Sequence, residues 1–257
     1  MKFIPLLLVG NTSLRCSHTA CLIGIMTSFH LHIIAMVSML CDHLGRTILP
    51  EMVWLTYVGR MAFPIYAFLL TEGHRHTRDV KRYILRLLVF SLLSEIPFDL
   101  MLYGTVCYWN HQNCLWTLLL GLLSLHLSDR IRSHETDTVT SVIKVFFILF
   151  FSCITSVLLR LDYGPLGILQ IFLFSAIRKE HQHAHLYQLF GTLLLHALIV
   201  TDPCLPFPGL HIPVQTFAVL ALIPIRFYSG NQGYHSKVWT LLCYFFYPLH
   251  MLILAVL

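Results

Sequence analysis

Mostly apolar runs, each about as long as a helix that crosses a lipid bilayer, recur along this chain with short polar segments between them. A membrane-spanning helix needs roughly 17–25 mostly apolar residues. The bilayer core holds no water, so a spanning chain must be a helix bundle or a closed β-barrel. Barrel strands alternate apolar and polar residues, and these runs do not. The candidate spans are 29–45, 56–73, 82–102, 113–128, 139–159, 163–178, 185–201, 210–227 and 238–256.

Composition agrees with a membrane protein. Hydrophobic residues make up 57% of the chain and charged residues 11%, and the mean hydropathy is +0.74. A water-soluble domain carries about twice that charged fraction. We therefore predict an all-α, polytopic transmembrane helix bundle of about nine spans, which is a multi-pass protein of the cell membrane. The net charge of +5 fits basic cytoplasmic loops rather than nucleic-acid binding.

The first residues stand apart from the bundle. The opening MKFIPLLLVGNTSLRC resembles a short signal sequence, because its apolar part has the length of a signal h-region. A polar stretch, NTSLRCSHT, separates it from the next apolar run. We treat residues 1–25 as an N-terminal extension and residues 26–257 as one multi-span domain without internal repeats.

One loop sets the expected orientation. The segment 74–86 contains five cationic side chains, Arg75, Arg78, Lys81, Arg82 and Arg86. Positively charged loops stay in the cytoplasm, and alternation along the chain then places most other basic residues on that side too. The loops after the first, third and fifth spans face outward.

Titratable and amide side chains gather at the outward ends of six segments. They are Asp42, His43, Arg60, Glu95, Asp99, His111, Gln112, Asn113, Asp162 and His250. Ionisable groups inside spans are costly, and they face a cavity or each other. This pattern predicts a polar chamber that opens outward. An ion pair of Arg60 with Glu95 or Asp99 inside the bundle is the expected structural role for that arginine.

His43 is the first candidate catalyst. A neutral imidazole near pH 7 can accept a proton from an amine or a hydroxyl, although a helical His can equally be a hydrogen-bonded structural group. Asp42 precedes it in the sequence, but adjacent helical side chains point about 100° apart. Glu95, Asp99 or Asp162 is therefore better placed to orient the ring. The alternative is that Asp42 and His43 mark a helix end at the membrane surface.

The last span supplies a second candidate. Tyr247 and His250 are three residues apart and share a helix face, although an interfacial aromatic belt explains them equally well. The consecutive His111, Gln112 and Asn113 indicate a cavity lining, or, for Asn113, a helix cap.

We expect no metal site. The sequence HQHAH at 181–185 contains suitable ligands, but charged residues precede it directly, as is typical of a solvated loop. Cys107 and Cys114 bracket one loop and could form a disulfide if that loop faces an oxidising compartment.

Several stretches together resemble the TraX family of membrane proteins. They are HIIAMVSMLCDHLGR, VGRMAFPIYAFLLTEGHRHTRDVKRYILRLLVFSLLSEIPFDL, HQNCLWTLLLGLL, DYGPLGIL and YFFYPLHMLIL. The resemblance covers nearly everything after residue 26. TraX proteins take their name from a conjugation protein that N-acetylates pilin, and they are grouped with membrane acyltransferases.

The resemblance implies transfer of an acyl group, most simply acetyl, from acyl-CoA to an extracytoplasmic acceptor such as a protein N-terminus or a glycan. In such families a membrane histidine is the proposed catalyst. That role falls on His43, acting as general base or nucleophile, with His250 second and Asp42 beside them. Acyl-CoA is then a co-substrate, and no cofactor is bound permanently.

Two charged sets could assist this reaction. Arg75, Arg78, Lys81 and Arg82 could pair with the phosphates of acyl-CoA, although they can equally be topology signals alone. Asn113, Gln112 or Arg60 could stabilise the oxyanion. Tyr247, Glu95, Asp99, His111 and Asp162 complete the expected chamber lining.

Two other classes of protein fit the sequence less closely. Charges within the membrane and Pro-broken spans suit a secondary transporter, but the polar groups gather toward one side and no inverted repeat is visible. A non-catalytic scaffold for a surface or conjugation complex would tolerate loss of both His43 and His250.

Overall fold

The structure, a computed structural model, describes residues 24–177, 183–197 and 213–257, and these residues form helices with two isolated β-bridges. The helices are α1 (Ser28–Thr47), α2 (Val53–Gly59), α3 (Ala62–His76), α4 (Val80–Tyr103), α5 (Cys114–His134), α6 (Thr138–Leu158), α7 (Gly164–Ala176), α8 (Ala184–Ala197), the 3-10 helix η1 (Val214–Ala221), α9 (Leu222–Arg226) and α10 (Lys237–Val256). The all-helical prediction is confirmed for this part of the chain. The expected extension at 1–25 lies outside the described residues as far as residue 23, as do residues 181 and 182 of HQHAH.

Fewer helices than the nine expected have both the length and the composition of a membrane span. Within the described ranges there are four: Val53–His76, in which α2 and α3 form one span, and α5, α6 and α10. Helices α1 and α4 are long enough, at 20 and 24 residues, but several ionisable side chains interrupt their apolar surface. Helix α7 and the η1–α9 segment are apolar but short. The count of nine full spans is therefore not confirmed, although each predicted run contains a helix.

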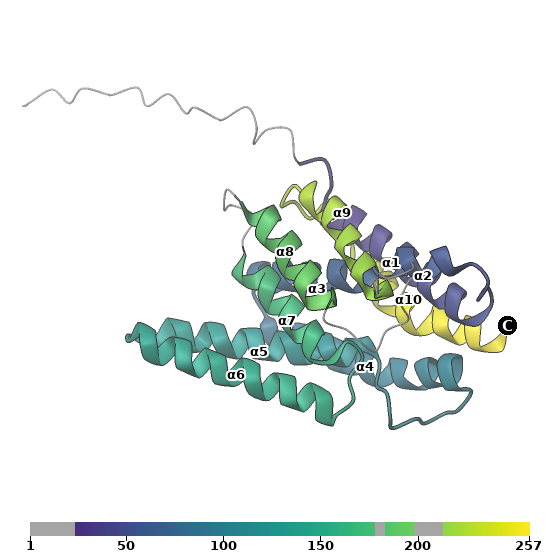
Figure 1. Ribbon diagram of the computed structural model, residues 1–257, viewed down its shortest axis with the longest axis horizontal. Coiled ribbons are helices and arrows are strands. Elements are labelled where there is room, and N and C mark those ends of the chain that lie inside the picture. Colours follow the sequence, from purple (N-terminus) through teal and green to yellow (C-terminus); the bar gives the residue numbers. More distant parts are fainter. Residues whose placement is uncertain (1–23, 178–182, 198–212) are drawn as a thin grey trace, which may run out of the picture.

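Helix α3 is the centre of the bundle. Its side chains Phe63, Ile65, Phe68 and Leu70 are buried, and it contacts α1, α5, α7 and η1. Helix α10 packs against both α1 and α4, so the first and last described helices meet. Figure 1 shows α8 and α9 on one side of this core and α6 on the opposite side.

Helix α6 shows how the bundle meets lipid. Its phenylalanines Phe146, Phe147, Phe150 and Phe151 are exposed, whereas its buried residues are serines. Toward α5, the Ser152 hydroxyl lies 2.6 Å from the Ser124 hydroxyl. Small hydroxyl residues let membrane helices approach closely and hydrogen-bond across the contact, so the phenylalanine face is the one left for lipid.

The connections between helices meet in two groups. The β-bridges pair Met26 with Tyr228 and Gln112 with Leu161. The charge-based orientation assigns the first pair to the cytoplasmic side and the second pair to the outside, so each bridge joins segments expected on the same side. The α5–α6 turn and the C-terminus lie at opposite ends of the molecule (Figure 1), as this orientation requires.

The proposed disulfide between Cys107 and Cys114 is wrong, because both are free thiols. Cys107 lies in the exposed outer loop, whereas Cys114 begins α5 and its thiol donates a hydrogen bond to the Tyr247 hydroxyl. The start of α5 therefore turns Cys114 into the bundle and away from the loop.

Helices α1 and α2 approach closely at two glycines. A Cβ on Gly59 would lie 2.6 Å from the Cα of Asp42, which is shorter than real Cβ contacts. A Cβ on Gly45 would lie 3.0 Å from the hydroxyl of Thr56, which is a tight contact. The absence of side chains at Gly45 and Gly59 is therefore what lets the end of α1 lie against α2.

Replacing Gly59 by alanine should lower the thermal stability of the detergent-solubilised protein, because the new methyl group would meet rigid backbone at Asp42. Overpacking of this kind costs about 1–3 kcal/mol. Gly45→Ala is the matched control, and it should cost less because its nearest neighbour is the side chain of Thr56. A Gly59→Ala protein with the wild-type Tm would contradict the close approach of the two helices.

The expected orientation predicts opposite labelling of two single-cysteine proteins. In a cysteine-free background, a cysteine introduced at Thr77 should resist a membrane-impermeant thiol reagent in intact cells, because the 74–86 loop is cationic and stays inside. The native Cys107, restored alone, is exposed in the opposite loop and should react. Reaction at position 77 with protection at Cys107 would invert the assignment.

Candidate functional site

Two histidines from opposite ends of the chain form a buried pair. His43 lies near the end of α1 and His250 lies in the second half of α10. Nδ1 of His43 is 2.7 Å from Nε2 of His250. The two rings are nearly parallel, with centroids 4.9 Å apart. The sequence indicated both residues as candidates, and the fold brings them into direct contact.

Hydrogen bonding determines where the protons lie in the neutral pair. Nδ1 of His250 is 2.6 Å from the carbonyl oxygen of Phe246, and a carbonyl can only accept, so this nitrogen carries a proton. Nε2 of His250 must then accept from the Nδ1–H of His43. Nε2 of His43 is left with its lone pair, and it has no hydrogen-bond partner among the described residues. An imidazole nitrogen in this state can act as a general base.

Asp42 connects this pair to a second polar group. Its Oδ2 is 2.9 Å from Nε of Arg46, and its Oδ1 is 3.6 Å from Nη2 of Arg60. Arg60 also donates a hydrogen bond of 3.1 Å to Oε1 of Gln215. The expected pairing of Arg60 with Glu95 or Asp99 is therefore wrong. The break between α2 and α3 places Arg60 beside α1 and η1, whereas both acids lie on α4.

The acids of α4 hold the start of α5 instead. Glu95 accepts hydrogen bonds from the side-chain amide of Asn113 and from Nε1 of Trp116. Asp99 accepts from the backbone N–H of Tyr108 at 2.7 Å. These contacts fix the loop between α4 and α5, so both carboxylates serve as anchors for it.

Asn113 acts as a helix cap. Its Oδ1 accepts from the backbone N–H of Leu115 at 3.0 Å, and its Nδ2 donates to the carbonyl of Ser91 as well as to Glu95. Both protons of the amide are thus engaged. This occupation leaves no donor on the Asn113 side chain for an oxyanion.

His111 and Asp162 form a further pair at the outer surface. Nε2 of His111 is 3.3 Å from Oδ1 of Asp162, and the Tyr103 hydroxyl is 2.7 Å from Nδ1 of His111. Burial disfavours the charged form of both groups, but their hydrogen bond and opposite charges outweigh it. The pKa of His111 is therefore raised and the pKa of Asp162 is lowered. Gln112 contributes its backbone, which bonds to Arg160 and to Asp162 at 3.0 Å.

A strained turn holds Asp162 in place. Arg160 and Tyr163 have φ angles of 55° and 60°, in the left-handed region that costs a non-glycine residue about 1–3 kcal/mol. The Tyr163 ring stacks on Phe63 of α3, with ring centroids 3.9 Å apart. This packing offsets the strain and points the turn toward the bundle.

These residues enclose a small outer cavity. It has a volume of about 40 Å³ and is lined by Met39, Asp42, His43, Arg46, Gly59, Ala62, Phe63, Tyr66, Phe98, Cys114, Leu118, Asp162, Tyr163 and Tyr247. A water molecule needs about 10–15 Å³ by this measure, so the outer cavity holds only a few waters. Of the residues predicted to line an outer polar chamber, Asp42, His43, Asp162 and Tyr247 line this cavity. Arg60, Glu95, Asp99, His111, Gln112, Asn113 and His250 are not among its lining residues.

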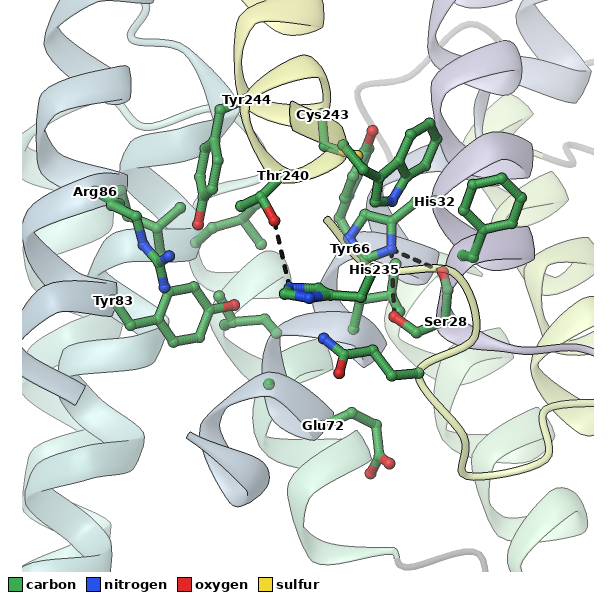
Figure 2. A pocket seen from close by; sticks show the side chains of 18 of the residues that line it. Ser28, His32, Tyr66, Glu72, Tyr83, Arg86, His235, Thr240, Cys243 and Tyr244 are labelled. Carbon is green, nitrogen blue, oxygen red and sulfur yellow. Dashed lines mark hydrogen bonds between the residues drawn. The ribbon is translucent and has the colours of Figure 1, made fainter. Parts of the chain in front are cut away.

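A much larger inner cavity lies toward the cytoplasmic ends of the helices. Its volume is about 550 Å³. Figure 2 shows His235 near its centre, hydrogen-bonded to Thr240, with Arg86 beside the rings of Tyr83 and Tyr244. The start of α1, the end of α3, the start of α4, the 230–235 loop and the start of α10 surround it.

The two cavities share part of their walls. Five residues line both of them, namely Met39, Tyr66, Cys114, Leu118 and Tyr247. The Cys114 thiol donates to the Tyr247 hydroxyl at 3.4 Å across this shared wall. The hydroxyl proton of Tyr247 has no acceptor among the residues that the structure describes. A free O–H donor therefore lies at the wall, close to the histidine pair.

The four basic residues expected to bind phosphate lie elsewhere. Arg75 pairs with Glu72 at 2.8 Å, and Arg82 pairs with Asp79 at 2.9 Å. Arg78 and Lys81 are exposed, and none of the four lines the inner cavity. Their use as phosphate ligands remains a prediction, since no phosphate group is present.

Sequence reasoning did not single out Tyr66, Arg86 or His235 as site residues. Arg86 was interpreted only as one of the cations that orient the 74–86 loop toward the cytoplasm. Its spacing of three residues from Tyr83 nevertheless places both side chains on one helix face. Tyr66 lies within an apolar run and His235 within a polar loop, so neither gave a local signal. Their common cavity depends on the packing of four separate segments.

The family model described as "TraX protein" matches residues 28–257. A curated relative from Dichelobacter nodosus, "Probable fimbrial assembly protein FimC, serogroup H1", is 28% identical over 245 residues, which cover 89% of this chain and 94% of that protein. No solved structure gives a significant match. The family match extends over almost the whole helical bundle, and the chain therefore belongs to the TraX family.

Proposed function

We propose that this protein is a multi-span membrane acyltransferase that moves an acyl group, most simply acetyl, from acyl-CoA to an acceptor on the extracytoplasmic side. The observation that carries this proposal is the His43–His250 pair, which leaves a basic nitrogen on His43, a residue that lines the outer cavity beside the wall shared with the inner cavity. A donor from the cytoplasm and an acceptor from outside could meet at that wall. In this proposal α1, α4, α7, α8 and the η1–α9 segment cross the membrane together with the four longer spans.

The chemical step follows from the free nitrogen. Nε2 of His43 accepts the proton of the acceptor amine or hydroxyl while that nucleophile attacks the thioester carbonyl. A C–N or C–O bond forms and the C–S bond breaks. The proton then passes from the imidazolium to the CoA thiolate, and the products are the acylated acceptor and free CoA. Transfer through an acyl group on Nε2 of His43 would use the same atom.

The oxyanion of this step needs a hydrogen-bond donor near the wall. The hydroxyl of Tyr247 is suited to this task because it lines both cavities and its proton is unengaged. The amide of Asn113 is fully hydrogen-bonded, and Arg60 does not line either cavity. We therefore assign oxyanion stabilisation to Tyr247 rather than to those two residues.

The relative favours a protein acceptor. FimC of Dichelobacter nodosus is named as a probable fimbrial assembly protein, and a fimbria is a protein assembly at the cell surface. A fimbrial or pilin subunit is thus the first acceptor to test, with surface glycans second. An acceptor of either kind would approach the outer cavity from the extracytoplasmic side.

A secondary transporter is the second candidate, because two cavities that share part of their walls are also expected of alternating access. Reconstituted vesicles separate the two functions. A transporter would accumulate a solute in response to a proton gradient without consuming acetyl-CoA. An acyltransferase would release CoA and label an acceptor with no gradient present.

Replacing His43 by alanine should abolish most acyl transfer. The assay incubates purified protein with radiolabelled acetyl-CoA and a membrane lysate, then measures label on peptide, glycan and lipid fractions. Turnover should fall by about 10²–10⁴, which is the usual contribution of a positioned general base. His134→Ala, at the exposed end of α5, is the control and should retain full turnover. If His43→Ala shows wild-type turnover at matched protein levels, His43 is not the general base. If neither protein transfers label, a scaffold is the better description.

His250 should act as a positioning residue. Phenylalanine at this position keeps a ring for stacking but removes the acceptor for the Nδ1–H of His43. The proton of His43 is then no longer held on Nδ1, so Nε2 is not always free to act as the base. We expect kcat to fall about 10- to 100-fold, less than for loss of the base itself, with the KM for acetyl-CoA unchanged. His250→Gln retains an acceptor and should recover part of the rate. Equal defects in both variants would argue against control through the His43 tautomer.

A further inference from the structure

The inner cavity contains a permanent cation without an acidic partner. The guanidinium carbon of Arg86 lies 5.8 Å from the ring centroids of both Tyr83 and Tyr244, so two rings hold it in place. Among the described residues no carboxylate lies within ion-pairing distance of Arg86. The other arginines that begin this part of the bundle, Arg75 and Arg82, are paired with acids. Among the described residues, Arg86 is therefore the arginine or lysine that lines this cavity, and it has no acidic partner.

The same cavity carries aromatic rings at its cytoplasmic entrance. Phe29 lies 4.5 Å from the ring of Trp239 and 5.6 Å from that of Tyr234, measured between centroids. All three belong to segments at the start of α1 or α10, where the cavity begins. His235 extends into the cavity beside them (Figure 2). Such rings provide stacking surfaces for a planar base.

The cavity also leads toward the histidine pair. At 1.5 Å per residue, Arg86 lies about 9 Å along α4 from its cytoplasmic start, and Tyr247 lies about 15 Å along α10 from its start. The cation is thus nearer to the entrance and the shared wall is deeper. From the entrance inward, the cavity thus offers aromatic rings, then a cation, then the shared wall. A ligand that matches has an aromatic base at one end, anionic groups next, and an uncharged arm that ends in the reactive group.

We propose that the inner cavity is the donor site and that Arg86 binds the phosphates of acyl-CoA, with the base among the aromatic rings and the pantetheine arm directed to Tyr247. This inference rests on the proposed function and identifies where its donor binds. In this proposal Arg86 takes the place of Arg75, Arg78, Lys81 and Arg82 as the phosphate ligand, because it lines the cavity and they do not. Glu72 also lines the cavity, but Arg75 at 2.8 Å neutralises it.

The test measures the binding of CoA and of pantetheine, which lacks the phosphates and the base, to the full-length protein in detergent. Arg86→Gln should weaken CoA binding by about 10- to 100-fold, the usual effect of losing hydrogen bonds to a charged group. Pantetheine binding should not change. The matched control is Arg82→Gln, one turn earlier on the same helix. Arg82 is paired with Asp79 and does not line the cavity, so this variant should bind both ligands as the wild type does.

Two results would overturn the donor site: unchanged CoA affinity in Arg86→Gln, or an equal loss in Arg82→Gln. If Arg86→Gln does not yield folded protein, Arg86→Lys decides, because it keeps the charge but loses the planar stacking and the two-pronged contact. It should bind CoA more weakly than the wild type, and unchanged binding would overturn the proposal.

The radiolabel assay separates this inference from the function on which it rests. If label is transferred to an acceptor and the KM for acetyl-CoA is the same in Arg86→Gln as in the wild type, the donor site is wrong but the acyltransferase function stands. If Arg86→Gln weakens CoA binding but the wild-type protein transfers label to no acceptor, the acyltransferase function is wrong. The protein is then a membrane protein that binds CoA at this cavity.

Discussion

The bilayer supplies no water to the interior of this bundle, so each polar group there needs a partner within the protein. Most of the polar groups at the outer end meet this condition. Asp42 is shared by Arg46 and Arg60, and Asn113 uses its whole amide. The groups that remain without partners are therefore informative. Among them are Nε2 of His43 and the hydroxyl proton of Tyr247, and both residues line a cavity. Arg86 contacts two tyrosine rings but has no acidic partner among the described residues, and it also lines a cavity.

The sequence was a good guide to which residues would gather, and a poor guide to how they would pair. Hydropathy and the basic loop placed His43, Asp162 and His250 at one depth in the membrane. Span length and loop charge can be read along the sequence, and they determine how deep a residue lies. Pairing depends on how helices rotate and cross. The break between α2 and α3 turned Arg60 toward Asp42, and the tight contact at Gly59 held α1 there. Neither effect is visible in a hydropathy pattern.

The cavities were the least predictable feature. An outer chamber was expected from charged side chains, but the larger inner cavity was not. Its walls combine apolar residues with several tyrosines and with residues of the 230–235 loop. Residues of these types are common at membrane interfaces, so each one alone is uninformative. Only the packing of α1, α3, α4 and α10 around a common space distinguishes Tyr66 and His235 from an ordinary interfacial belt.

The unequal sizes of the two cavities bear on how the proposed reaction could avoid wasting its donor. A thioester held at the wall is open to hydrolysis if water has free access to it. The outer cavity, at about 40 Å³, admits only a few waters, and the contact between Cys114 and Tyr247 closes the wall on the inner side. In the proposed reaction, an acceptor that enters the outer cavity would displace those waters on its way to Nε2 of His43. The turn at Arg160 to Tyr163, held in a strained conformation by stacking on Phe63, borders that cavity. In the proposed reaction an acceptor seated beside this turn would take the place of the water, so that the thioester would meet the acceptor's nucleophile instead.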